Sequence, residues 1–231
     1  MNKIRRQQSR VFYTTLPTFL FVLIAFILAG KGYADKSVSF DINSNRISVH
    51  YCKSKVEVPL TDIRFNFEKE TVTVSRNCRV SAEQLERGEK IEVQINKIDL
   101  TNSGSLETKV HLHWSPDENI LRKWISYRIN GEKPPLLRKI ILDEREIVSK
   151  KNNLHISENE VQSYPVFDSG YFAGIEYPIA STNIKKSLAE ISHFVGERLK
   201  PGKWYQSRKI IYGFTKTGYE VETFKQYISK N

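Results

Sequence analysis

Two histidines and three acids come nearest, in type and spacing, to a metal-binding or catalytic set. His111 and His113 are two residues apart in an alternating segment, so they project from one face of a predicted strand. That spacing can hold a metal ion, but no third ligand can be named, and a solvated strand face is the preferred interpretation. Asp143, Asp168 and Glu176 are candidates for the paired carboxylates of glycoside hydrolysis, yet a chain with 26 acids offers many such candidates.

Motifs for nucleophilic or phosphate chemistry are missing from the sequence. It contains no Gly-x-Ser-x-Gly segment, and neither cysteine has the local context of a catalytic nucleophile. Gly196 and Gly202-Lys203 are spaced one residue too far apart for a phosphate loop, and Trp204 stands where that loop needs Ser or Thr. The sequence therefore predicts no catalytic residue, no metal ligand and no cofactor.

One acid and four aromatic residues are the candidate ligand-binding residues. Glu176 interrupts an apolar strand, so it must face solvent or be hydrogen-bonded, either to a neighbouring Arg or backbone amides, or to a ligand or adjacent domain. Flat aromatic side chains can stack on sugar rings, although core or interface positions are the commoner alternative. The four aromatic candidates are Tyr171, Tyr177, Trp204 and Tyr205.

The first 34 residues are the strongest local signal. A basic stretch, Met1 to Arg10, precedes an unbroken apolar run from Phe19 to Ala29, and the small residues Gly32 and Ala34 suit signal peptidase cleavage after Ala34. The twenty residues from Val11 to Gly30 are also long enough for an uncleaved membrane anchor, and a buried core helix is a third alternative. The first two alternatives place the rest of the chain outside the cytoplasm, whether periplasmic, secreted or anchored.

The two cysteines, Cys52 and Cys78, both follow this leader. An even count in an oxidising compartment favours a single disulfide, with two buried thiols as the alternative. No Cys-x-x-Cys or paired-histidine motif accompanies them, so a zinc site is not predicted.

The basic charge of the chain does not indicate a nucleic-acid partner. The net charge is +10, from 36 basic and 26 acidic residues, but five of the basic residues precede residue 35, where no acid occurs. The remaining charges of both signs are interspersed, whereas nucleic-acid proteins usually concentrate basic residues on one face or arm.

Apolar residues alternate with polar ones from Ser37 onward, which is the pattern of strands with one buried face. The alternation changes parity between Ile95 and Ile98, which predicts a β-bulge. Many strands with little helix predict an all-β fold, a large antiparallel β-sandwich of the supersandwich type with one or two short helices besides the N-terminal hydrophobic helix. The clearest alternating positions are Ile47, Val49, Tyr51, Val56, Val58, Ile63, Phe65, Phe67, Val110, Leu112, Trp114, Ile125, Tyr127 and Ile129.

The chain is predicted to divide into three segments: residues 1–34 as signal peptide or anchor, 35–218 as the sandwich, and 219–231 as a short helix. A polar stretch at 149–163 is the predicted linker or long loop. Ser81 is expected to cap a short helix that ends at Gly88. Pro201-Gly202 is expected to join 190–195 to 204–214 as a hairpin.

Three stretches together resemble the N-terminal β-sandwich of bacterial alpha-galactosidase-like and raffinose-synthase-like glycoside hydrolases. They are Trp114 to Leu142, with its strand-turn-strand pattern; Phe172-Ala173-Gly174-Ile175-Glu176-Tyr177-Pro178; and Lys200-Pro201-Gly202 with Ile211-Tyr212-Gly213-Phe214 and Phe224-Lys225-Gln226-Tyr227-Ile228. In that family the sandwich precedes a (β/α)8 barrel that supplies two catalytic aspartates, for which this sequence has no matching positions.

The resemblance implies a non-catalytic exported module, a truncated N-terminal domain that packs on a catalytic barrel. A stand-alone envelope protein that binds carbohydrate or mediates adhesion is the alternative, and an enzyme with an unrecognised site is a third. The expected partners are a carbohydrate or a barrel domain, and the membrane if the leader is not cleaved.

Overall fold

The computed structural model describes residues 38–43, 46–60, 62–74, 81–101, 104–148, 164–176, 180–185 and 187–230. The leader, Cys78, the stretch 149–163 and Tyr177 lie outside the described residues, so the predictions for them stay predictions. Val38 to Asn231 form one compact unit, which the following paragraphs describe by itself.

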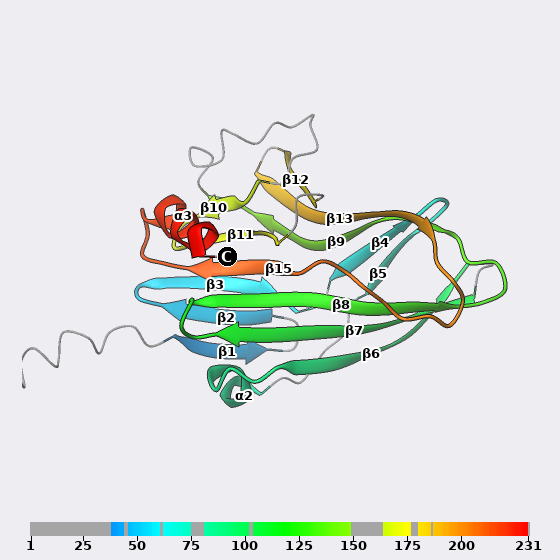
Figure 1. Ribbon diagram of the computed structural model, residues 1–231, viewed down its shortest axis with the longest axis horizontal. Helices are drawn as coiled ribbons and strands as arrows, with labels where there is room; N and C mark the ends of the chain where they lie inside the picture. Colours follow the sequence, from blue (N-terminus) through cyan, green and yellow to red (C-terminus); the bar gives the residue numbers. More distant parts are fainter. Residues whose placement is uncertain are drawn as a thin grey trace, which may run out of the picture. The chain divides into compact units, whose positions relative to one another are not determined.

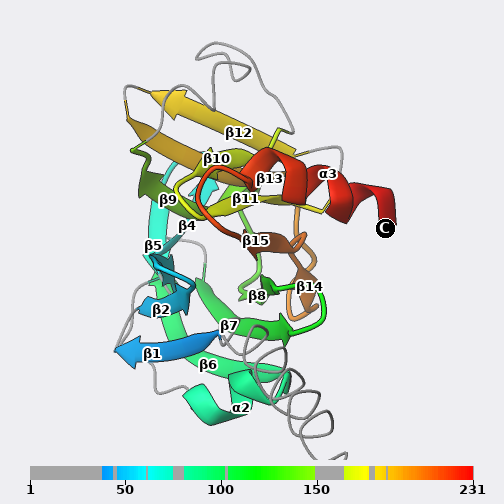
Figure 2. The same cartoon turned by 90° about the vertical axis from the view of Figure 1, so that its left-hand side faces the viewer.

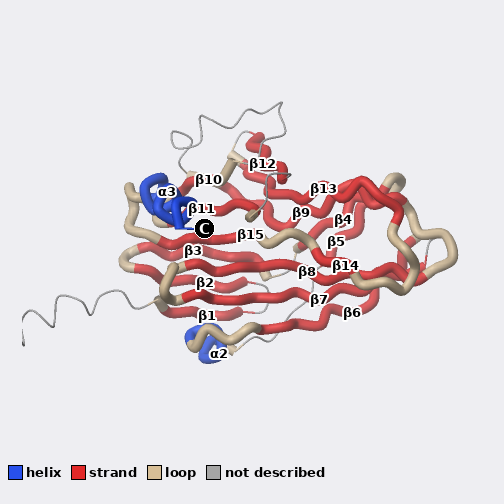
Figure 3. Tube along the Cα trace, in the orientation of Figure 1, coloured by secondary structure: helices blue, strands red, loops and turns tan. Residues whose placement is uncertain are grey.

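Almost all of the regular structure in this unit is antiparallel strand, which confirms the predicted all-β fold (Figures 1 and 3). The three-stranded sheet has the order β1-β2-β3, and the five-stranded sheet has the order β12-β13-β9-β4-β5. The large sheet runs β10-β11-β15-β8-β7-β6, with the short β14 also paired to β8. The strands are β1 (Ser39–Asn43), β2 (Arg46–Tyr51), β3 (Ser54–Pro59), β4 (Ile63–Phe67), β5 (Thr71–Val74), β6 (Ile91–Leu100), β7 (Gly104–Ser115), β8 (Ile120–Asn130), β9 (Leu136–Glu146), β10 (Val166–Asp168), β11 (Tyr171–Ile175), β12 (Ala180–Lys185), β13 (Leu188–Arg198), β14 (Tyr205–Gln206) and β15 (Ile210–Phe214).

The sheets pack as a sandwich, with the large sheet on one side and the two smaller sheets on the other (Figure 2). The alternating apolar residues of all three sheets form one buried cluster, in which Ile47, Phe65 and Leu112 are fully inaccessible. Burial of one face of each sheet is what the period of two requires. The β6–β7 register also shifts between Ile95 and Ile98, where the change of parity predicts the bulge.

The short helix α2 (Ala82–Glu86) begins as predicted. The Ser81 side chain accepts a hydrogen bond from the backbone N–H of Gln84 at 3.4 Å, and Gly88 follows the helix with φ +73°. Helix α3 (Glu220–Lys230) matches the expected C-terminal helix closely. Among the described residues, neither helix has the length and apolar character needed to cross a membrane.

The expected hairpin around Pro201-Gly202 is wrong. β13 pairs with β9 and β12 in the five-stranded sheet, whereas β14 and β15 pair with β8 in the large sheet. The turn therefore carries the chain from one layer of the sandwich to the other. A turn signal marks where the chain reverses but does not say which strand the next segment pairs with.

The predicted disulfide is not supported. Cys52 lies in the β2–β3 turn, where it is exposed and its thiol is free. It adopts a left-handed backbone conformation with φ 55°, which is uncommon for a residue with a side chain.

A buried lysine joins the three sheets. Lys123, on β8, is fully inaccessible, and its ammonium group donates to the carbonyls of Pro59 at 2.7 Å and Leu142 at 2.8 Å. Pro59 belongs to the three-stranded sheet and Leu142 to the five-stranded sheet, so the two carbonyls come from different sheets. Lys123 thus satisfies backbone acceptors that would otherwise be costly to bury.

An ion pair lies beside this lysine in the same interior. The Arg145 guanidinium pairs with the buried Asp143 carboxylate, with Nε to Oδ2 at 2.7 Å. The guanidinium also lies 5.1 Å from the ring centroid of Tyr171 and 5.0 Å from that of Tyr212. Burial in this cluster raises the pKa of both tyrosines. Buried charges of this kind persist when each is paired.

Helix α3 covers one end of the outer face of the large sheet, the face that points away from the core. Phe224 and Tyr227 pack there on a separate apolar cluster of Ile120, Phe167, Phe172 and Ile211. A Cβ at Gly213 would lie 2.1 Å from the Phe172 ring, so only glycine leaves room for that ring.

Candidate functional site

Beyond α3, the outer face of the large sheet carries rows of polar and aromatic side chains. One row crosses three neighbouring strands in register, with Glu92 on β6 opposite His111 on β7, and His111 opposite Trp124 on β8. Lys209 continues this row, because the next residue, Ile210, pairs with the residue before Trp124. Cross-strand neighbours on one face lie close enough to interact directly, so residues far apart in sequence meet here.

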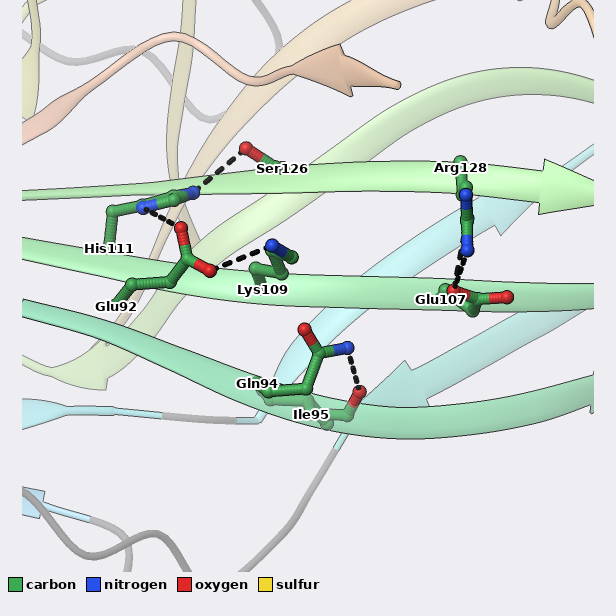
Figure 4. Close-up of polar contacts among 8 residues, drawn as sticks. All are labelled: Glu92, Gln94, Ile95, Glu107, Lys109, His111, Ser126 and Arg128. Carbon is green, nitrogen blue, oxygen red and sulfur yellow. Dashed lines mark hydrogen bonds and ion pairs between the residues drawn. The ribbon is translucent and has the colours of Figure 1, made fainter. Parts of the chain in front are cut away.

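His111 contacts Glu92 on one side and Ser126 on the other, as Figure 4 shows. Its Nε2 lies 2.8 Å from the Ser126 hydroxyl oxygen, and its Nδ1 lies 3.6 Å from Glu92 Oε2. Its ring stacks on Trp124 at a centroid distance of 5.1 Å. Only 5% of its surface is exposed, so the expectation of a solvated face is wrong for His111. Burial is the main cause that lowers its pKa, although the charge of Glu92 opposes the shift.

The next rows are held by ion pairs that are also drawn in Figure 4. Lys109 Nζ donates to Glu92 Oε1 at 2.8 Å, and Arg128 Nη2 donates to Glu107 Oε2 at 2.7 Å. Lys109 Nζ and the Arg128 guanidinium lie 5.3 and 4.7 Å from the ring centroid of Trp204. Cation–π attraction therefore holds the Trp204 indole over these strands, and 36% of this side chain stays exposed.

Trp124 is covered, in contrast to Trp204. It is 7% exposed, and the ammonium groups of Lys90 and Lys209 lie 5.0 and 5.4 Å from its ring centroid. With His111 stacked on it as well, this indole organises charged neighbours and does not offer an open face.

Glu176 lies at the border between the polar rows and α3. Arg122 Nε donates to its carboxylate at 2.9 Å, and the Tyr227 hydroxyl of α3 donates to the same oxygen. Arg122 also donates to Ser115 and to Glu118. The expected bond to a neighbouring Arg is thus present, and it ties α3 to the sheet.

The other predicted ligand-binding residues do not gather at one place. Tyr171 is buried on the core side, against Arg145. Tyr205 stacks on Tyr127 with 5.9 Å between ring centroids, and its hydroxyl accepts from the Lys200 backbone N–H at 2.8 Å. Of the described candidates, Trp204 is the one whose aromatic ring combines exposure with a polar surrounding. Their binding of a ligand stays a prediction.

Sequence reasoning missed the row through Trp124. Glu92, His111 and Lys209 come from three distant segments, and only the strand register places them beside this indole. The available signal was the alternation of apolar and polar residues in β7 and β8. It predicts on which face of the sheet His111 and Trp124 lie, but it does not predict which residues of the neighbouring strands they contact.

Ser126, His111 and Glu92 have the order of a hydrolytic triad, but the geometry does not complete one. The distance of 3.6 Å between His111 and Glu92 exceeds a hydrogen bond, and Ser126 is only 6% exposed. Ser126 lies inside β8 between β7 and β14, and the N–H of the preceding Ile125 donates to the Ser207 hydroxyl at 3.0 Å, so this N–H does not serve an oxyanion hole. The hydrogen bond satisfies a buried imidazole.

One cavity lies away from the outer face, and another lies beside it. A cavity of about 480 Å³ opens between β3, β9 and β10, lined by residues that include Lys55, Glu57, Arg145 and Asp168. A second, of about 340 Å³, lies beside the outer face and includes Arg87, His113 and Glu118 in its lining. Within the described ranges, no cluster of His, Cys, Asp and Glu has the arrangement of a metal site.

Comparisons with known proteins find similarity among solved structures and not among sequences. No family model and no curated protein matches the sequence. Among solved structures, the chain is similar to a galactose mutarotase related enzyme from Lactobacillus acidophilus, with 8% sequence identity and a TM-score of 0.39 over 78% of this chain and 98% of that chain. This TM-score is too low to support a functional conclusion, and the relation to alpha-galactosidase-like hydrolases stays a prediction.

Proposed function

We propose that this chain is an exported, non-catalytic β-sandwich module that binds saccharide on the outer face of its large sheet. The observation that carries the proposal is the indole of Trp204, which is 36% exposed and held by Lys109 and Arg128 over a polar strand surface. A sugar ring offers a flat array of C–H groups to such an indole and hydroxyl groups to the polar side chains around it.

The residues around Trp204 match the needs of a polyhydroxylated ligand. Glu107 and Glu92 supply carboxylate acceptors, and Arg128 and Lys109 supply donors. All four are fixed by ion pairs with each other along β6, β7 and β8, so little side-chain entropy is lost when a ligand binds. Saccharide binding generally combines an apolar platform with a few oriented polar groups, which is the arrangement found here.

Substitution of Trp204 tests the proposal. We expect Trp204→Ala to weaken retention on immobilised galactosides or cell-wall polysaccharides by about tenfold or more, because it removes the stacking platform. Affinity electrophoresis of the mature protein would measure this loss, and mass spectrometry would show whether that protein begins at Asp35, as export with cleavage requires. Tyr219→Ala is the matched control, since Tyr219 is an aromatic residue 61% exposed at the start of α3.

Two results would contradict the proposal. One is a wild-type protein that no polysaccharide of the panel retains. The other is equal retention of wild type and Trp204→Ala.

A second candidate function is docking to a catalytic barrel, as the family resemblance implies. The observation in its favour is exposed apolar surface at α3, where Val221 is 41% and Ile228 is 55% exposed. The genomic sequence downstream tests it: a barrel-like coding region with two strand-end acids supports docking, and the lack of one in any frame removes its support.

A further inference from the structure

Two lysines converge on one indole at the edge of the candidate site. The ammonium groups of Lys90 and Lys209 lie 5.0 and 5.4 Å from the Trp124 centroid, so they are at most 10.4 Å apart. Lys90 directly precedes β6 and Lys209 directly precedes β15, at opposite sides of the β7–β8 pair. Both lysines are exposed, and attraction to the indole keeps their charges over the same part of the sheet.

These two charges differ from the other cations of the outer face. Lys109 is paired with Glu92, Arg128 with Glu107, and Arg122 with Glu118 and Glu176. Lys90 and Lys209 take part in none of the ion pairs formed within the described part of the chain. Glu92 feels the charge of Lys90 but pairs with Lys109, so the region around Trp124 holds two positive charges outside these ion pairs.

The pKa values of the neighbouring histidines are affected by the same positive charges. Burial is the first cause that lowers the pKa of His113, and the charges of Arg122, Lys209 and Lys90 lower it further. His111 also has a lowered pKa, with Lys90 and Lys109 among the causes. An anion placed between Lys90 and Lys209 would meet favourable charge on both sides and neutral imidazoles nearby.

We infer that the saccharide bound on this face is acidic, with a carboxylate or sulfate group held between Lys90 and Lys209 while a sugar ring stacks on Trp204. The inference rests on the proposed function and adds the ligand class. Trp204 contacts Lys109, and the row of cross-strand neighbours that contains Lys109 adjoins the row that contains Trp124. The stacking surface of Trp204 and the two lysines over Trp124 therefore lie on neighbouring rows of one sheet face. A chain of linked uronic acids would present rings and charges along such a face.

Nucleic acid fits this face less well than an acidic saccharide. A nucleic-acid site needs a run of unneutralised cations along the phosphate backbone. Here the cations on the adjoining rows, Lys109 and Arg128, are already paired with carboxylates, and the pair Lys90 and Lys209 is shorter than the run that a phosphate backbone needs.

A matched pair of polymers tests the inference. We expect the mature protein to bind polygalacturonate at least about tenfold more tightly than its neutral methyl ester, since esterification removes the carboxylate charge. Lys90→Gln with Lys209→Gln should abolish this preference and leave binding of the ester unchanged. Lys53→Gln with Lys69→Gln, two exposed lysines in turns of the two smaller sheets, is the control and should keep the preference.

Each other outcome overturns the inference. Equal binding of the acid and its ester would overturn it and leave saccharide binding intact. Binding of polyglutamate or duplex DNA as tightly as polygalacturonate would show a general polyanion site. A protein that binds neither polygalacturonate nor dextran sulfate would also overturn the inference. In that case, retention of wild type and Trp204→Ala on the polysaccharide panel decides separately whether the proposed function stands.

Discussion

Replacement of Lys123 by Met should lower the free energy of unfolding by about 2–4 kcal/mol. The substitution removes the ammonium group that donates to Pro59 and Leu142, and so leaves two buried carbonyls without this donor. The loss comes from these hydrogen bonds and not from the charge, because burial outweighs the attraction of Asp143 and disfavours the charged form of Lys123. Met has a similar length and volume, so the loss reports the polar contacts and not a cavity.

Chemical denaturation followed by circular dichroism would measure this loss. Lys139→Met is the matched control, because Lys139 is partly exposed and pairs with Glu190 at the surface of the five-stranded sheet. Such a pair contributes about 0–1 kcal/mol. Equal stability of the two variants would show that the hydrogen bonds of Lys123 do not stabilise the packing of the sheets.

The pH dependence of the unfolding free energy provides a second test of the buried state of Lys123. Burial is the main cause that lowers its pKa from 10.5 to about 8 in the folded protein. Between pH 8 and 10 the unfolded chain therefore binds more protons at this residue, and stability rises with pH by about 2 kcal/mol. Above pH 10 the buried tyrosines, whose pKa values are raised, reverse the trend. Lys123→Met should lack the rise between pH 8 and 10.

The fold class follows from the sequence because burial of one sheet face imposes the period of two directly on the residues. Ile47, Val49 and Tyr51, for example, alternate in the sequence and are all buried on β2. Strand partners depend on contacts between distant segments, and local turn chemistry does not encode them. The turn at Pro201-Gly202 illustrates this, because it connects two layers and not two neighbouring strands.

The candidate site was predictable only in part for the same reason. Trp204 stands out as an aromatic residue in a turn-rich segment, and Glu176 as an acid in an apolar strand. Lys90 and Lys209 carry no local signal, since their importance comes from their shared position over Trp124. Lys123 has the same parity as Ile125 and Tyr127, so the alternation places it on the buried face. Its partners, the carbonyls of Pro59 and Leu142, are shown only by the structure.

Acidification should destabilise the protein through its histidines, above all His193. This residue lies on β13, and burial first, then the charge of Arg208, lowers its pKa from 6.5 to about 4. The pKa of the folded state is therefore below that of the unfolded state, and the unfolded chain binds the extra proton between these two values. Stability is fully present above pH 6.5 and falls as the pH drops to 4, by roughly 3 kcal/mol from His193 alone.

The pH slope of the unfolding free energy in His193→Gln tests this prediction, because Gln does not titrate. We expect the variant to be less sensitive than wild type between pH 6.5 and 4, whatever its stability at pH 7. His111 and His113 keep part of the slope in the variant, since their pKa values are also lowered by burial. Below pH 4.5, Glu57 and Glu92, whose pKa values are lowered too, add a loss common to both proteins. Parallel curves for the two proteins from pH 6.5 to 4 would show that His193 is charged in the folded state, and that the interior around β13 admits solvent.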